Sequence, residues 1–263
     1  TTSTQAVLPS PKSVSWRPVC TTSCCDPKQW PNKGKWCRRC DMRQCMQGGQ
    51  LVGCCTSEKD AGTLAKGATK TARGGWRLQA SYTYFLDRGL VSEIGKIVAG
   101  ATVLELGAGM GCYTAALRDA GAADPTLGPK QARGFDGAPH VTDLTEGLVG
   151  EADLTTDLTL GTADWVISLE VGEHVPRKHE DLLFSTLTNH AMKGVILSWS
   201  NHRGGRGHLN PKPPRYVVQQ MELRGFQADR LASRRLALSA KVAYWIGSSV
   251  MVYRRKSAVP PLP

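Results

Sequence analysis

From residue 82 onward, apolar residues recur in patterns typical of buried strands and amphipathic helices. Apolar side chains fall at helical spacing over residues 82–98, and the short apolar run 102–106 (TVLEL) then predicts a buried strand. Helices are predicted over 82–98, 112–121, 178–192 and 213–224, and strands over 102–106, 132–136, the residues before Asp153, 165–169, 195–199, 236–240 and 250–253. This alternation predicts an α/β fold: a parallel sheet with helices on both faces, closed by two antiparallel strands.

Composition divides the chain of 263 residues into two parts. Residues 1–75 hold 12 Lys and Arg against 4 Asp and Glu, whereas residues 76–263 hold 21 against 18. We therefore predict an extended tail, a Cys-rich basic module and a linker in the first part, and the α/β domain in the second. No run of about 18 apolar residues is present, so no membrane-spanning helix is predicted.

Eight of the nine cysteines lie in the first part: Cys20, Cys24, Cys25, Cys37, Cys40, Cys45, Cys54 and Cys55. The two adjacent pairs favour a disulfide framework over one tetrahedral zinc site, whereas C-R-R-C at 37–40 has a spacing that zinc and redox sites share. We expect disulfides, and hence a secretory lumen or an extracellular location; a zinc cluster would instead allow a cytoplasmic one. The basic charge would suit a sulfated glycan or nucleic acid, or it is simply solvated.

The segment 103–114 (VLELGAGMGCYT) carries the most informative motif. Three glycines, Gly107, Gly109 and Gly111, follow the predicted buried strand and precede a helix. A backbone without side chains at this point lets a ligand approach closely at the carboxyl end of the strand. For the glycines alone, a tight turn without a ligand is the alternative.

Acidic residues at the ends of neighbouring strands favour a ligand. Glu105 lies on the strand just before the glycines. Asp136 ends the second predicted strand (G-F-D-G), where a carboxylate can accept hydrogen bonds from two ribose hydroxyls. Asp153 (A-D-L) follows the third strand, in position for an adenine amino group. Together these residues predict a nucleoside-containing cofactor.

The motifs E-L-G-A-G-M-G, G-F-D and A-D-L together resemble those of the class I S-adenosylmethionine-dependent methyltransferases, over roughly residues 76–256. The resemblance implies a Rossmann-like, seven-stranded sheet with a reversed final hairpin, and S-adenosylmethionine as cofactor. The residues implied to bind it are Glu105, Gly107, Ala108, Gly109, Gly111, Asp136, Asp153, Leu154 and Glu170.

The fourth predicted strand ends in E-x-x-E-H, formed by Glu170, Glu173 and His174. This segment is similar to one in ubiquinone-biosynthesis O-methyltransferases, where the two Glu and the His bind a divalent cation beside the substrate. The resemblance implies the same ligands here, and two carboxylates with an imidazole suit Mg²⁺, Mn²⁺ or Zn²⁺. Two alternatives stay open: a site without metal, in which Glu170 contacts cofactor and His174 orients substrate, and a purely structural role.

A glycine-rich polar loop, residues 198–211, follows the fifth predicted strand and is expected to shape a substrate pocket at the same edge of the sheet. Its G-H-x-N piece resembles one in a poorly characterised methyltransferase branch, which makes His208 and Asn210 site candidates; a solvated basic loop is the alternative. An imidazole titrates near neutrality, so His174 and His208 are candidates for the general base. Glu173 is the third catalytic candidate.

These motifs predict an enzyme that transfers a methyl group by in-line displacement to a nucleophile, expected to be a hydroxyl of a small molecule, glycan or peptide. One alternative is a nucleic-acid methyltransferase that uses the basic first part as a clamp. The fourth strand lacks the N-P-P-Y type motif of amino-directed base methylation. Another alternative is a binding protein without catalysis on the same fold.

Overall fold

The structure, a computed structural model, describes residues 46–47, 50–51, 86–205, 207–241 and 243–256. Strands β1 (Met46–Gln47) and β2 (Gln50–Leu51) form a short antiparallel pair. The eight cysteines of the first part lie outside the described residues, so the division at residue 75 and the disulfide framework stay predictions. Among the described residues, no helix combines the length and apolar character that a membrane span needs.

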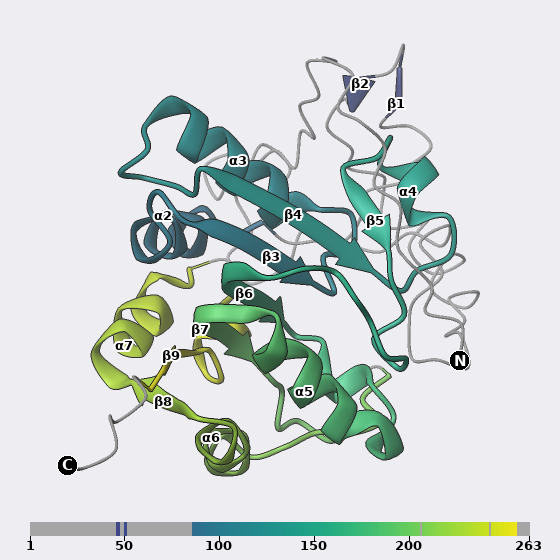
Figure 1. Cartoon of the computed structure of the whole chain (residues 1–263), viewed down its shortest axis with the longest axis vertical. Coiled ribbons are helices and arrows are strands. Elements are labelled where there is room, and N and C mark those ends of the chain that lie inside the picture. The colour runs from purple at the N-terminus through teal and green to yellow at the C-terminus, as the bar shows by residue number, and fades with distance from the viewer. Residues whose placement is uncertain (1–45, 48–49, 52–85, 206, 242, 257–263) are drawn as a thin grey trace, which may run out of the picture.

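The main sheet has seven strands in the order β5-β4-β3-β6-β7-β9-β8 (Figure 1). Its strands are β3 (Thr102–Leu106), β4 (Gln131–Asp136), β5 (Val149–Glu151), β6 (Ala163–Leu169), β7 (Ala191–Ser198), β8 (Phe226–Asp229) and β9 (Met251–Arg255). Strands β3 to β7 pair in parallel, and β9 runs antiparallel to both β7 and β8. The predicted α/β fold, with seven strands and a reversed final hairpin, is confirmed.

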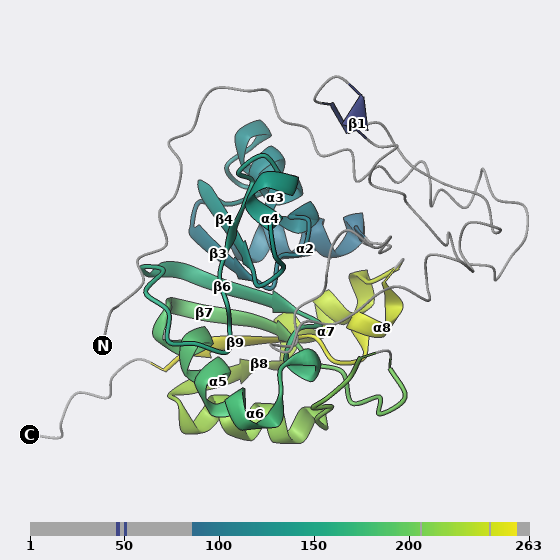
Figure 2. The same cartoon turned by 90° about the vertical axis from the view of Figure 1, so that its right-hand side faces the viewer.

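Helices cover both faces of the sheet. They are α2 (Arg88–Ile97), α3 (Cys112–Ala123), α4 (Val141–Leu144), α5 (Glu180–Asn189), α6 (Pro214–Leu223), α7 (Arg230–Ser239) and α8 (Tyr244–Gly247), with 3-10 turns η2 (Gly172–His174) and η3 (Arg177–His179). Figures 1 and 2 show α5 and α6 side by side along the sheet. One buried cluster joins these two helices to the sheet, and a second joins α2, α3 and α7 to it.

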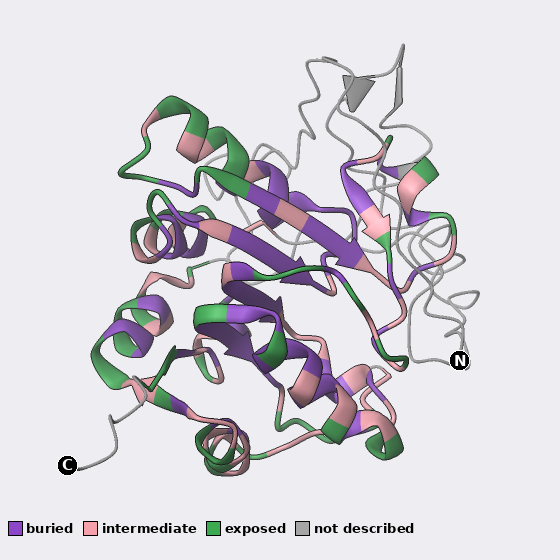
Figure 3. Ribbon diagram, viewed as in Figure 1, coloured by how far each residue is buried: buried purple, intermediate pink, exposed green. Residues whose placement is uncertain are grey.

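Alternation along the central strands explains the two clusters. Val166 of β6 and Val195 of β7 pack with α5 and α6, whereas their neighbours Ile167 and Ile196 pack with α2 and α7. All four side chains are fully buried, as expected for parallel strands covered on both faces (Figure 3). This packing fixes the carboxyl ends of the parallel strands along one edge, where ligands collect in open α/β sheets.

The strand predicted at 236–240 is wrong, because these residues belong mainly to α7. The sixth strand is β8, directly before that helix. The Asp229 side chain accepts a hydrogen bond from the Ala232 amide (3.0 Å) and caps the helix, and Ala232, Ser233 and Leu236 are buried on its inner face. The buried residues of this segment follow a helical spacing, although we interpreted the segment as a strand.

Two predicted helix ends also differ. Helix α3 continues past Gly121, where a side chain would overlap the Pro129 carbonyl, so this glycine permits close packing and does not end the helix. Residues 191–192, predicted as helix, begin β7, because His190 and not Gly194 marks the end of α5.

Candidate functional site

The glycine turn between β3 and α3 is held by backbone hydrogen bonds. The Gly107 and Ala108 amides donate to the Phe135 carbonyl on β4, at 2.8 and 3.0 Å. Gly107, Gly109 and Gly111 have φ of 79°, 55° and 76°, which favour glycine, and a Cβ at Gly107 would overlap the Val171 side chain. The turn thus requires glycine for its backbone angles and for its close packing.

Asp136 ends β4 beside this turn. Its Oδ2 accepts from the Gly109 amide (2.7 Å) and its Oδ1 from the Ala138 amide (2.8 Å). Burial raises the pKa of this carboxyl, and the two amides partly offset the rise. Each carboxylate oxygen has a second lone pair, so Asp136 can still accept hydrogen bonds from a ligand.

Asp153 lies just after β5, and its Oδ1 accepts from the Thr155 amide (3.0 Å) and hydroxyl (2.7 Å). The next residue, Leu154, is buried in the cluster that contains α5, so its side chain contributes to the core. The structure thus places Asp136 at the end of β4 and Asp153 just after the neighbouring β5, as predicted.

Glu105 lies in the strand beneath the turn and is 4% exposed. Its Oε2 accepts a hydrogen bond from the Thr114 hydroxyl of α3. Burial raises the pKa of Glu105 to about 7, with the Thr114 bond acting in the opposite direction. This arrangement links β3 to α3 underneath the glycines, so that Glu105 supports the turn from below.

Glu170 follows β6 with φ of 57°, a left-handed conformation that is unfavourable for a residue with a side chain. The Ser198 hydroxyl at the end of β7 stabilises it twice, because it accepts from the Glu170 amide and donates to its Oε1, both at 2.9 Å. The Ser249 hydroxyl also donates to Oε1 (3.3 Å). Glu170 is therefore oriented by side chains from two other segments of the same edge.

Glu173, in η2, is fully buried. Neither of its carboxylate oxygens has a hydrogen-bond partner among the described residues. Burial raises the pKa of this carboxyl, and the nearby Glu170 carboxyl raises it further. The backbone of Ser200 lowers this pKa, although it is not placed to form a hydrogen bond with the carboxyl. A buried carboxyl without partners is costly unless something else compensates it.

His174 and His208 meet beside Glu173. Their ring centroids are 5.0 Å apart, and ligand atoms of Glu173, His174 and His208 lie within 4.8 Å of one another. Each Nδ1 lies within hydrogen-bond distance of a carbonyl, Gly207 O for His174 (3.1 Å) and His202 O for His208 (2.6 Å). Because a carbonyl only accepts, Nδ1 is the donor, and in the neutral rings Nε2 is the acceptor.

The loop that carries His208 is fastened by its backbone. The Leu209 and Asn210 amides both donate to the Glu173 carbonyl, at 2.7 and 2.9 Å. The buried Asn210 side chain donates to Glu180 on α5 (2.7 Å). Asn210, a candidate from the sequence, thus anchors the loop.

Sequence reasoning missed Ser198, Ser249 and Glu180 as supporting residues. Glu180 also pairs with Lys212 (2.6 Å) and accepts from the Tyr216 hydroxyl. Ser198 had one available signal, its position at the end of the fifth predicted strand. Ser249 and Glu180 meet the site only through tertiary packing, so no local pattern identifies them.

No protein-family model matches the chain, and no curated protein matches it. Solved structures with a similar fold include magnesium protoporphyrin IX methyltransferase from Synechocystis PCC 6803 with bound SAH (17% identity, 61% of this chain and 76% of that chain, TM-score 0.43). They also include SAM-bound CalS10, an amino pentose methyltransferase from Micromonospora echinaspora (13% identity, 66% of this chain and 99% of that chain, TM-score 0.47). A third is the cyclase SpnF (14% identity, 74% of this chain and 91% of that chain, TM-score 0.44).

The strand order agrees with the seven-stranded sheet and reversed final hairpin that the resemblance to class I S-adenosylmethionine-dependent methyltransferases implies. A fold of this kind supports more than one activity. The function of this chain is therefore argued from its own site residues.

Proposed function

We propose that the protein is an enzyme that transfers a methyl group from S-adenosylmethionine to a hydroxyl group of its acceptor. One observation carries the proposal: the glycine turn with its flanking carboxylates and the buried cluster of Glu173, His174 and His208 lie at the same edge of one sheet. The first suits a nucleoside and the second suits a reacting hydroxyl.

The cofactor half of this edge consists of the glycine turn, Asp136 and Asp153. Asp136 is suited to accept from the ribose hydroxyls and Asp153 from the adenine amino group, while the bare backbone of the turn admits the rest. When bound, S-adenosylmethionine supplies a methyl group already activated by its sulfonium. Holding both partners in line is therefore the main task of these residues.

A divalent cation fits the second half. Glu173 is a buried carboxyl without a hydrogen-bond partner in the described part of the chain, and two imidazoles converge on it. Carbonyls at Nδ1 orient each ring, as second-shell groups commonly do for ligating histidines. We assign Glu173, His174 and His208 as its ligands, with Glu170 beside them; a bound cation would favour deprotonation of an acceptor hydroxyl.

In the transfer, the acceptor oxygen gains the methyl group and loses its proton, and the sulfonium becomes a neutral thioether. The residues of the chain hold the hydroxyl beside Glu173, His174 and His208. With a cation on these three side chains, the neighbouring Glu170 carboxylate would take the proton. An imidazole suits proton removal near neutral pH. If no cation is used, His208 or His174 would take this proton directly.

The acceptor class can be found by incubating the full chain with methyl-labelled S-adenosylmethionine and pools of small molecules, glycans, peptides and nucleic acids. The proposal expects label on hydroxyl oxygens, identified by mass spectrometry, together with demethylated cofactor. Label on nucleobase nitrogens would overturn the choice of acceptor. Saturable cofactor binding without transfer to any pool would favour a binding protein instead.

A further inference from the structure

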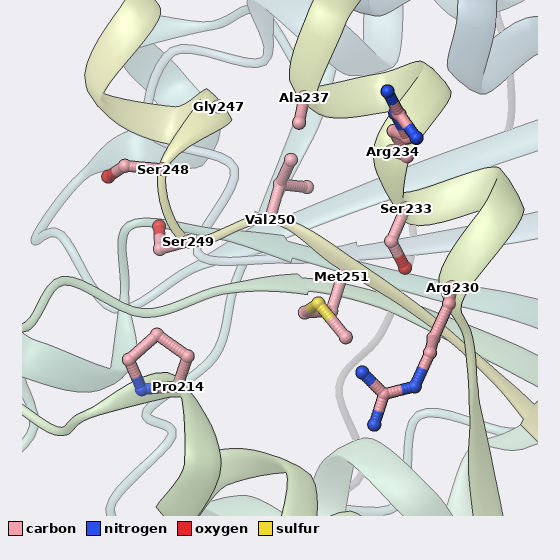
Figure 4. A pocket seen from close by; sticks show the side chains of 10 residues that line it. All are labelled: Pro214, Arg230, Ser233, Arg234, Ala237, Gly247, Ser248, Ser249, Val250 and Met251. Atoms are coloured by element: carbon pink, nitrogen blue, oxygen red, sulfur yellow. The ribbon is translucent and has the colours of Figure 1, made fainter.

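A cavity of about 250 Å³ lies between α7, the segment after α8 and the start of α6. Arg230 and Arg234 come from α7 and Ser248 and Ser249 from the segment before β9, with Met251 between them (Figure 4). None of its ten lining residues is acidic. The cavity is therefore lined by two positive charges and by no negative charge.

The two arginines of the cavity differ from others nearby. Arg235 pairs with Glu93 and Arg254 pairs with Asp229, both at 2.8 Å. Arg230 and Arg234, one helical turn apart, form no hydrogen bond or ion pair with any described residue. Their guanidinium groups are exposed and remain available to a ligand.

The cavity adjoins the candidate site through Ser249. The Ser249 side chain lines the cavity, and its hydroxyl donates to Oε1 of Glu170 (3.3 Å). Pro214, which also lines the cavity, begins α6 soon after the loop that carries His208. A molecule that extends from the cavity past Ser249 would thus approach the cluster of Glu173, His174 and His208.

We infer that this cavity binds an anionic group of the methyl acceptor, a carboxylate or a phosphate. Guanidinium groups bind both oxyanions with paired hydrogen bonds, so the arginines are the groups that would hold the anion. The acceptor would then carry its negative charge in the cavity and its reactive hydroxyl at the neighbouring cluster. That the ligand is the methyl acceptor rests on the proposed function. That the cavity binds an anion does not depend on it.

Arginine modification tests the cavity in the intact protein. Phenylglyoxal is applied to the full chain with and without pyrophosphate or citrate, and modified residues are located by mass spectrometry. We expect one or both anions to lower the rate of modification of Arg230 and Arg234 at least fivefold. The rate of modification of Arg235 and Arg254 should stay unchanged. Equal modification of Arg230 and Arg234 with and without both anions would overturn the inference.

A charge-matched pair of variants provides the control. R230Q/R234Q removes the two cavity charges, and R88Q/R235Q removes two exposed charges elsewhere. By calorimetry, the affinity for the protecting anion should fall at least tenfold in the first variant and less than twofold in the second; equal losses would reduce the effect to net charge and contradict the site. S-adenosylhomocysteine is titrated into the same samples. If wild-type protein binds the anion but not this compound, the proposed function fails and the anion site stands.

Discussion

Near the ends of β3 and β4, the Asp136 carboxyl is held by backbone amides. Near the ends of β6 and β7, the Glu173 carboxyl is not held in this way. Both oxygens of Asp136 accept backbone amides, at 2.7 and 2.8 Å. Both oxygens of Glu173 lack hydrogen-bond partners among the described residues, although its side chain is fully buried. The Asp136 carboxyl is thus held by the protein itself, whereas the Glu173 carboxyl would gain its partners from the proposed cation. We therefore expect the halves to respond differently to mutation, chelation and pH.

The largest effect is expected at Asp136. Asp136→Ala removes the acceptor for two ribose hydroxyls, and charge-assisted hydrogen bonds contribute about 1.5–3 kcal/mol each. We expect the affinity for S-adenosylhomocysteine to fall about a thousandfold in a calorimetric titration, with an unchanged circular dichroism spectrum. Asp157→Ala, at an exposed position of the following loop, is the control and should bind as wild type does. Undiminished affinity of Asp136→Ala would move the ribose site elsewhere.

The second largest effect concerns the acid–imidazole half. Glu173→Ala and a strong chelator should each lower the transfer rate roughly a hundredfold, and the chelator should not slow the variant further, because both remove the same cation. Cofactor affinity should stay within twofold. Titration with Mn²⁺, followed by its magnetic resonance signal, should show one tight site in wild type and in the Glu222→Ala control, and none in Glu173→Ala. Full activity in chelator would exclude the cation.

Glu105 gives the cofactor half a pH-dependent stability. Its pKa rises from 4.5 to about 7 on folding, so it stabilises the fold fully below pH 4.5 and this contribution is lost as pH rises through 7. A shift of this size corresponds to about 3 kcal/mol, and relaxation around the charge should leave about 2 kcal/mol. Glu105→Gln keeps the acceptor for Thr114 without the charge.

We therefore expect Glu105→Gln to gain about 2 kcal/mol over wild type between pH 5 and pH 8, measured by urea unfolding. Glu222→Gln, at an exposed position on α6, should show no such gain. A Glu105→Gln curve parallel to that of wild type across this range would mean that the carboxyl is ionised at no cost in the folded protein.

The smallest effect tests how the loop of His208 is held. Tyr216→Phe removes one hydrogen bond to Glu180, worth about 1 kcal/mol, and leaves the bonds from Asn210 and Lys212. We expect about a fivefold loss in kcat/KM for the acceptor, with cofactor affinity unchanged, and a normal rate in Tyr244→Phe, at an exposed position of α8. A loss of cofactor affinity equal to the loss of rate would show that the halves are not independent.

The sequence predicted the positions of the residues around the glycine turn better than the contacts around Glu173, because the former depend on local spacing. Strand 102–106 has the predicted bounds, and Asp136 and Asp153 lie where strand ends predict them. His208 was found as a candidate, but its contact with Glu173 depends on a loop docked by backbone hydrogen bonds that no spacing encodes. Leu154 stays a predicted cofactor residue; its side chain packs in the core, so any contact with the cofactor would come from its backbone.

Binding of S-adenosylmethionine by the glycine turn and Asp136 can be observed in a crystal structure of the chain with S-adenosylhomocysteine. We expect electron density along Gly107–Gly111, with the ribose hydroxyls at Asp136 and the adenine at Asp153. Density for the compound at another place, or none at a saturating concentration, would contradict it.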